Sequence, residues 1–438
     1  MPWPTPERLF LHPTTAEGPT REPCLPIIRH LPRAAATKPH PSNALGWNAS
    51  LMFIGTATTI LEWEGIRLMT DPNFLLKGDS LQKGLGAITT RITDPAMNLH
   101  DLPRIDVVLL SHYHEGHFDR AVEKDLRRSI PIITTAHAKA HLTSKDREDD
   151  AFTSVYTLDT YQSTMLEIMP NLHSDVQTLK TPAIKVTAMP AKHVSSQLAA
   201  SLNFFIQAVP PVTGWMLELG YFPHSSATNN GFECGYRIYI TGDTLLCNEL
   251  KEMYARYEGK KIDLMMMHLG GAILPEPNPP SLASMDASQG LQLLQLIRPD
   301  LTIPIHYDDY DIFKSPLKEF KDAVKTAGLE AKVLYLERRE EYRFKVSSPL
   351  SPFLVAGSRA VHCELIQYFT AAIAPCYIYV AVDGLLTRGG TFSPLSPFLV
   401  AGLRAVHCEL IQYFTAAIAP CYTEIGGGTT VITGITGW

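Results

Sequence analysis

The sequence predicts a layered α/β domain over most of its 438 residues, and three observations support this fold class. Short β-rich runs bounded by turn residues begin near residue 46. The first runs follow one another closely, as in antiparallel hairpins, and later runs alternate with helical patterns. Hydrophobic residues make up 45% of the chain and charged residues 19%, which is typical of a soluble globular protein with a sizeable core. The pattern is complete near residue 345.

We expect the chain to have three parts: an arm at 1–45, the domain at 46–345 and a tail at 346–438. The arm is rich in proline and has no sustained periodicity, which predicts an irregular structure. The tail has only seven charged residues, so we expect it to pack, self-associate or bind an apolar surface. Within it, residues 348–377 recur at 393–422 with one difference. Two near-identical copies indicate a duplicated segment, since solenoids need about three copies to bury a core.

The expected strands are short runs rich in β-branched and other apolar residues. In chain order they are 51–55, 58–63, 66–71, 105–111, 183–190, 214–220, 236–243, 261–270, 301–307 and 331–337. Helical patterns are expected at 119–129, 284–299 and 315–330. The last two carry start and stop signals such as Ser, Asp, Pro and Gly near their ends.

The stretch LLSHYHEGHFDR, residues 109–120, places three histidines after a strand of the buried type. His112 and His114 are two residues apart, so on an extended chain their side chains point the same way. His117 follows where the chain turns into the next helix. Neutral imidazoles are good zinc ligands, and a catalytic zinc needs three protein ligands and an open position. The stretch therefore predicts a metal site.

Four further candidates lie at the ends of other predicted strands. They are Asp71 in LMTDP, His193 in MPAKHVS, Asp243 in YITGDT and His306 in IPIHYDD. In layered α/β folds, ligand-binding residues gather at strand ends on one rim. Four such residues in order, together with the histidine triplet, strengthen the prediction of a metal site.

This series resembles the five motifs of the metallo-β-lactamase superfamily, over about residues 45–345. The stretches FIGTATTILEWEGIRLMTDP, LPRIDVVLLSHYHEGHFD and HLGG are most similar to one branch of it. That branch holds the L-ascorbate-6-phosphate lactonase and the N-acyl-phosphatidylethanolamine phospholipase D. The resemblance implies a four-layer αβ/βα sandwich with metals at one edge of its two sheets.

The resemblance also implies a set of metal ligands and two supporting residues. The first metal would be bound by His112, His114 and His193. The second would be bound by His117 and His306, and Asp243 would bridge the two metals. Asp71 would orient ligands through hydrogen bonds from behind. His268, at another strand end, is either a substrate contact or general acid, or a structural histidine. These ligands suit one or two Zn²⁺ ions, and also Mn²⁺ or Fe²⁺.

Gly116 departs from the motif of this family, which is HxHxDH with an aspartate at that position. The aspartate ligates the second metal and accepts a hydrogen bond from the metal-bound hydroxide, and a glycine can do neither. We therefore expect weakened binding of the second metal. Glu115 and Asp119 are near in sequence, but we expect the first to point away and the second to serve the structure.

The function that follows is a metal-dependent hydrolase, with a metal-bound hydroxide attacking a lactone, amide or phosphodiester. The glycine-bearing segment 73–103 would form a substrate-side loop, with Arg91 and Lys77 or Lys83 as anion contacts, although solvated lysines are the commoner case. The alternative is a catalytically weak or inactive relative that acts in binding or regulation. A nuclease and a membrane-lipid enzyme remain further alternatives.

Charge and cysteine content bear on partners and location. The net charge of −6 gives no general attraction to nucleic acid, so we expect a small-molecule substrate and no nucleic-acid partner. The apolar tail suggests contact with membrane lipid, and the oligomeric state stays open. No window is long and apolar enough for a membrane span, and the start lacks a secretory signal. Seven widely spaced cysteines indicate reduced thiols and hence the cytoplasm.

Overall fold

The computed structural model describes ten stretches of the chain, all within a compact unit that runs from Met1 to Leu350. The stretches are 8–13, 18–21, 28–41, 46–83, 87–144, 148–169, 180–193, 210–223, 231–274 and 281–348. The predicted tail at 346–438, with its duplicated segments 348–377 and 393–422, lies outside them apart from its first three residues.

The first large sheet has eight strands in the order β10-β9-β8-β5-β4-β3-β19-β2. Strands β3, β4 and β5 form an antiparallel meander, and β19 lies antiparallel to β3. The pairs from β5 through β8 and β9 to β10 are parallel, as is the pair of β19 and β2. The strands are β2 (Thr37–Pro39), β3 (Ala49–Gly55), β4 (Thr58–Trp63), β5 (Ile66–Thr70), β8 (Val107–Leu109), β9 (Ile132–Thr134), β10 (Val155–Thr157) and β19 (Glu341–Phe344).

The second large sheet has seven strands in the order β1-β11-β12-β13-β14-β15-β18. Its long central strands are antiparallel, and β14, β15 and β18 are parallel to one another. The strands are β1 (Arg8–Leu11), β11 (Ser163–Ile168), β12 (Lys180–Met189), β13 (Gly214–Pro223), β14 (Glu233–Ile240), β15 (Leu264–His268) and β18 (Leu301–Ile305).

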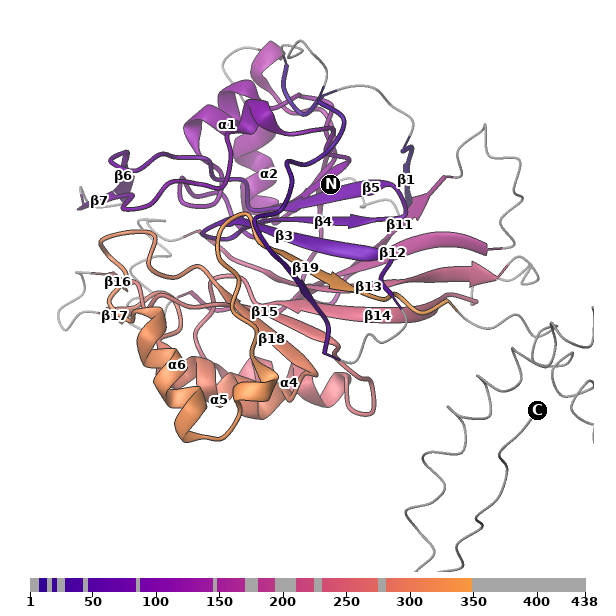
Figure 1. Cartoon of the computed structure of the whole chain (residues 1–438). Coiled ribbons are helices and arrows are strands. Elements are labelled where there is room, and N and C mark those ends of the chain that lie inside the picture. The colour runs from indigo at the N-terminus through magenta and orange to yellow at the C-terminus, as the bar shows by residue number, and fades with distance from the viewer. Residues whose placement is uncertain are drawn as a thin grey trace, which may run out of the picture. The chain divides into compact units, whose positions relative to one another are not determined.

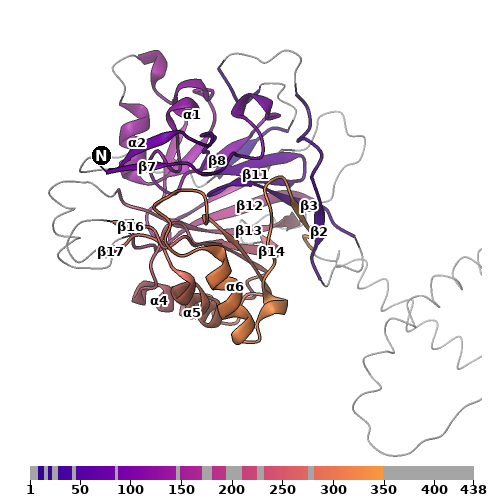
Figure 2. The same ribbon diagram turned by 60° about the vertical axis from the view of Figure 1, so that its left-hand side comes forward.

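Helices cover the outer face of each sheet, which gives four layers (Figures 1 and 2). The eight-stranded sheet carries α1 (Arg120–Asp125) and α2 (Ala136–Thr143). The seven-stranded sheet carries α4 (Asn248–Arg256), α5 (Ala287–Ile297) and α6 (Leu317–Thr326). One apolar core lies between the sheets and one lies under each helical layer. The predicted αβ/βα sandwich is confirmed. No helix in the described ranges has the length and apolar character that a membrane span requires.

Two small hairpins stand at one edge of the sandwich (Figures 1 and 2). One pairs β6 (Ser80–Lys83) with β7 (Ala87–Thr90), and the other pairs β16 (Ile273–Leu274) with β17 (Ser281–Leu282). The first hairpin lies inside the segment 73–103, which therefore contains more regular structure than the loop that the sequence predicted.

The sequence-based strands differ from the structure at both ends of the domain. The strand expected at 331–337 is wrong: the short 3-10 helix Glu330–Lys332 is followed by irregular chain with a single bridge at Val333. The nearby strand is β19 instead. In the N-terminal arm, expected to be irregular, β1 and β2 pair as outer strands of the two sheets. These short strands exist because a tertiary partner supplies their hydrogen bonds, which local pattern does not reveal.

Candidate metal centre

The strand ends bring the predicted ligands together at one edge of the sandwich. The six side chains follow five different strands, so five separate turns contribute to one site. Asp71 follows β5, His112 and His117 follow β8, His193 follows β12, Asp243 follows β14 and His306 follows β18. Because several of these strands are parallel, their carboxyl ends meet at the same rim.

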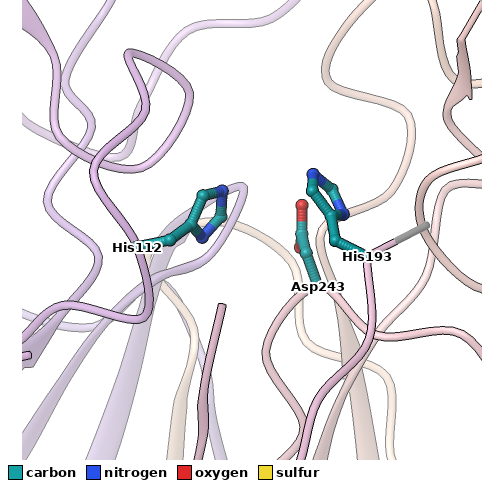
Figure 3. A group of neighbouring side chains, drawn as sticks. All are labelled: His112, His193 and Asp243. Carbon is teal, nitrogen blue, oxygen red and sulfur yellow. The ribbon is translucent and has the colours of Figure 1, made fainter. Parts of the chain in front are cut away.

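Asp243 lies in the middle of two groups of potential ligand atoms. Atoms of His112, His193 and Asp243 lie within 4.8 Å of one another, and so do atoms of His117, Asp243 and His306. Figure 3 shows the first group, with His112 reaching in from one side and His193 and Asp243 from the other. The shared carboxylate thus has the position of a bridge between two ions.

A hydrogen-bond chain from Asp71 fixes the orientation of His112. The Ser111 hydroxyl donates to Asp71 Oδ2 at 2.8 Å, because a carboxylate can only accept. The Ser111 oxygen lies 2.9 Å from His112 Nδ1 and therefore accepts the proton of that nitrogen. The Nε2 lone pair of His112 is then directed into the centre. Burial also lowers the pKa of His112 well below its usual value, so the ring is neutral and ready to ligate.

The same carboxylate orients His117. Its Nδ1 donates to Asp71 Oδ2 at 3.1 Å, and its Nε2 lies 3.2 Å from Asp243 Oδ2. Burial acts to lower the pKa of His117, but the Asp243 and Asp71 carboxylates outweigh burial and raise it to about 10. Without an ion, the ring is therefore a cation between two anions. Burial acts to raise the pKa of Asp243, but the surrounding histidines hold it well below its usual value.

Backbone carbonyls hold the remaining two ligands. His306 Nδ1 donates to the Leu269 carbonyl at 3.0 Å, and its Nε2 lies 3.4 Å from Asp243 Oδ1. His193 Nδ1 donates to the Ala283 carbonyl, beside β17. In all four histidines, Nδ1 is held by an acceptor, as in metal sites where the second nitrogen of each ligand is tied to the protein.

The donor set fits a divalent transition metal ion. His112 Nε2 and Asp243 Oδ1 are both buried and make no hydrogen bond. A buried polar atom without a partner is costly, and an ion bound between them would remove that cost. Imidazole nitrogens with one carboxylate suit Zn²⁺ and also Mn²⁺ or Fe²⁺. The residues present therefore accept the metal that the resemblance implies.

His114 is the one predicted ligand that the structure does not place in either group. Its Nδ1 accepts a hydrogen bond from the backbone nitrogen of Gly116 at 3.1 Å. This is the reverse of the other four rings, in which Nδ1 donates. The His114 ring still lies close by, with its centroid 5.8 Å from that of His112.

Gly116 lies under tight packing, although its backbone does not require a glycine. It is not among the residues with positive φ. A Cβ atom built there would meet His114 Nδ1 at 3.1 Å and Leu81 Cδ1 at 3.9 Å. The buried Asn73 fixes the backbone here, because its amide donates to the Gly116 carbonyl at 2.7 Å.

Neither neighbouring acid takes the place of the missing aspartate. Glu115 forms an ion pair with the exposed Arg120, and it is in neither group of potential ligands. Asp119 is fully buried and accepts from the backbone nitrogens of Val122, at the start of α1, and Phe74. Its role is therefore to cap α1 and to tie it to the segment that follows β5.

Comparison with known proteins identifies the family. A family model described as "Beta-lactamase superfamily domain" matches residues 81–307, which is more than half of the chain. The chain belongs to this superfamily. A "UPF0173 metal-dependent hydrolase" of Archaeoglobus fulgidus is 26% identical over 241 residues, covering 55% of this chain and 83% of that protein.

Two solved structures show the same fold. A possible metal-dependent hydrolase from Veillonella parvula aligns with a TM-score of 0.51 and 16% identity, covering 67% of this chain and 98% of that one. An isothiocyanate hydrolase from Delia radicum gut bacteria aligns with a TM-score of 0.50 and 18% identity, covering 68% and 99%. At these identities the likeness concerns the fold alone.

Two other predicted site residues, His268 and Arg91, are buried. His268 Nε2 lies 3.9 Å from Asp71 Oδ2, and burial lowers the pKa of His268 well below its usual value. A ring that is neutral and 1% exposed favours a structural role over that of a general acid. Arg91 is also 1% exposed and donates to Asn73 and Tyr310, so it is not available as a surface anion contact.

The lysines proposed beside it gain no support. Lys77 is exposed, and the side chain of Lys83 lies outside the described part of the chain. Two residues that do position the centre, Ser111 and Asn73, were not predicted. Each stands within two residues of a predicted one, in LLSH and TDPN. Their position next to predicted site residues was the one sign in the sequence of a role at the centre. Their hydrogen-bond partners, Asp71 for Ser111 and the Gly116 carbonyl for Asn73, are evident only in the folded structure.

Proposed function

We propose that this protein is a metal-dependent hydrolase whose centre holds up to two divalent ions. His112, His193 and Asp243 would bind one ion, and His117, His306 and Asp243 would bind the other. The observation that carries the proposal is that four histidines have Nδ1 tied to acceptors and their ligating side turned toward one carboxylate. Zn²⁺ is the ion that we propose first.

The chemistry of such a centre suits hydrolysis. A divalent ion bound there supplies a water nucleophile of lowered pKa and polarises the bond that is cleaved. The protein contributes fixed ligand orientation, because Asp71 accepts from both Ser111 and His117. It also contributes a buried carboxylate, Asp243, which stays ionised and counterbalances positive charge in the centre.

Substrate choice depends on the edge of the sandwich. The β6–β7 hairpin lies next to residues 111–118, the ligand loop, because Leu81 would be 3.9 Å from a Cβ atom placed on Gly116. On and beside this hairpin, Leu76, Ile88 and Ile92 are exposed by 48%, 67% and 44%. Exposed apolar side chains beside a polar centre favour a small substrate with an apolar part. We therefore propose a lactone or acyl amide first and a phosphodiester second.

Partners and location are proposals from composition. The net charge of −6 supports a small-molecule substrate in preference to nucleic acid. The low-charge tail supports contact with membrane lipid. Among the described cysteines, Cys234 and Cys247 form no disulfide, which agrees with the proposal of a cytoplasmic location.

A second candidate function is binding or regulation with little or no catalysis. The contact that favours it is the hydrogen bond from Gly116 to His114 Nδ1, which occupies the lone pair of that nitrogen. With no aspartate at 116, the second ion would have three protein ligands at most. Such a protein would bind a metal ion and turn over substrate slowly.

The decisive experiment combines metal content with turnover. The full-length protein is loaded with Zn²⁺, Mn²⁺ or Fe²⁺ and assayed on a panel of lactones, acyl amides and phosphodiesters. We expect at least one ion per chain and hydrolysis of one class. Asp243→Asn should lose both, while His100→Gln, an exposed histidine paired with Asp125, should lose neither.

Two results would count against the hydrolase. One is a wild-type protein that retains no ion after loading. The other is hydrolysis that survives Asp243→Asn at full rate. Tight binding of an ion with no turnover on any substrate would favour the second candidate function.

A further inference from the structure

Two histidines on α2 form a pair that is separate from the strand-end ligands. His137 and His141 are four residues apart, so they project from the same face of the helix. Their Nε2 atoms lie 3.3 Å apart, and their ring planes are inclined by 56°. The helix lies beside α1 on the outer face of the eight-stranded sheet (Figures 1 and 2).

The separation of the two nitrogens matches coordination of one ion. Two zinc–nitrogen bonds of about 2.0–2.1 Å at the tetrahedral angle place their nitrogens about 3.3–3.4 Å apart. A single N–H···N hydrogen bond also fits 3.3 Å, so the distance by itself does not decide. The Nδ1 atom of His137 is buried without a hydrogen-bond partner, which leaves the Nε2 side as the interacting side of that ring.

The His141 ring is held in place before any ion binds. Tyr113 stacks on His141 with ring centroids 4.8 Å apart and planes inclined by only 1°. The Tyr113 hydroxyl in turn donates to both carboxylate oxygens of Glu123 on α1, at 2.9 and 3.0 Å. Support of this kind reduces the conformational entropy that ligand binding would otherwise cost.

We propose that His137 and His141 form a peripheral site for a divalent transition metal ion of the zinc and copper class. Within the described ranges, no third His, Cys, Asp or Glu ligand atom joins the pair, so solvent completes the coordination. Imidazole ligands select zinc, copper and nickel over magnesium and calcium. With two protein ligands and not three, this site binds more weakly than the centre at the strand ends.

The site also touches the ligand loop. Tyr113 lies between His112 and His114 in the sequence, and its ring is the surface on which His141 stacks. An ion on the histidine pair would therefore restrain the loop from its outer side. This coupling does not depend on whether the protein is a hydrolase.

The test is a count of bound ions in the full-length protein. Protein already loaded at the central site is titrated with additional Zn²⁺, and bound zinc is measured after equilibrium dialysis. We expect His137→Gln and His141→Gln each to bind one ion fewer per chain than wild type. His100→Gln, a change of the same residue type at another exposed position, should bind as many as wild type. Equal binding in all four proteins would overturn the proposal.

A second measurement needs no variant. Additional Zn²⁺ should protect His137 and His141 of the wild-type protein from modification by diethyl pyrocarbonate, read by peptide mass spectrometry. His100 should be modified at the same rate with and without the ion. Unchanged modification of the pair at zinc concentrations that saturate the dialysis curve would overturn the proposal even if a variant failed to fold.

Discussion

The backbone nitrogen of Gly116 donates a hydrogen bond to Nδ1 of His114 at 3.1 Å. This bond distinguishes His114 from the four histidines that gather around Asp243, because a lone pair engaged by an amide is not available to a metal. The bond also links two unusual features of this loop. Gly116 departs from the family motif, and it is Gly116 that binds His114, the predicted ligand outside both groups.

The first prediction concerns Gly116→Asp. The backbone at 116 admits a side chain, and a new carboxylate would add a ligand for the second ion. We expect Zn²⁺ affinity to rise by roughly tenfold or more, with higher turnover. Gly116→Ala is the matched control, because its Cβ crowds His114 Nδ1 in the same way but offers no ligand. A gain that is equal in both variants would show that the carboxylate is not the cause.

The second prediction concerns Ser111→Ala, which breaks the chain from Asp71 to His112. The His112 ring then loses the acceptor that fixes its tautomer. We expect Zn²⁺ affinity to fall roughly 10- to 100-fold, measured with a competing chelator. Thr134→Val is the control, since it removes another buried hydroxyl, which donates to the Leu110 carbonyl at 2.7 Å. Equal loss of affinity in both would contradict a specific role for Ser111.

The third prediction is that ion uptake releases a proton. In the metal-free protein the pKa of His117 is raised to about 10, so the ring is charged at pH 7.5 and must lose its proton to bind an ion. We expect about one proton released per ion at this position, and an affinity that rises about tenfold per pH unit. Calorimetry in two buffers with different ionisation enthalpies measures the release, and equal heats in both would contradict it.

The raised pKa of His117 also makes the stability of the metal-free protein depend on pH. A histidine whose pKa is higher in the folded protein stabilises it fully below the unfolded value of about 6.5. That stabilisation is lost as the pH rises toward about 10, the folded value. We expect the metal-free protein to become less stable to urea across this range. His117→Gln should remove most of that slope, and an unchanged slope would show that other groups dominate.

The fourth prediction concerns Asn73→Ala. The change leaves the buried Gly116 carbonyl without its donor, which costs about 1–3 kcal/mol of unfolding free energy, and removes one acceptor of the Arg91 guanidinium, which still donates to Tyr310. Because Asn73 also positions the ligand loop, Zn²⁺ affinity should fall as well. Asn48→Ala is the control: it breaks two bonds to Val346 and should lower stability without changing affinity. An equal loss of Zn²⁺ affinity in Asn73→Ala and Asn48→Ala would contradict a positioning role for Asn73.

Sequence predicted the parts of this protein whose causes are local. Runs such as TTILEW at 58–63 match β4 to the residue, because an apolar run between turns needs no distant information. The strand-end positions of Asp243 and His306 followed from the same pattern. In contrast, β1 and β2 depend on partners far away in the chain, and the conformation of His114 depends on one backbone amide. Burial of Arg91 was equally invisible, because its partners come from separate segments.

The shared position of Asp243 has a consequence for the cohesion of the two sheets. His112 and His117 extend from the eight-stranded sheet, whereas His193, Asp243 and His306 extend from the seven-stranded one. An ion held between them would be a removable cross-link that joins both halves of the sandwich. Because the ligands come together only in the folded domain, ion binding stabilises the folded state over the unfolded chain. Chelation should therefore lower resistance to heat and protease across the whole domain, and not only at the rim.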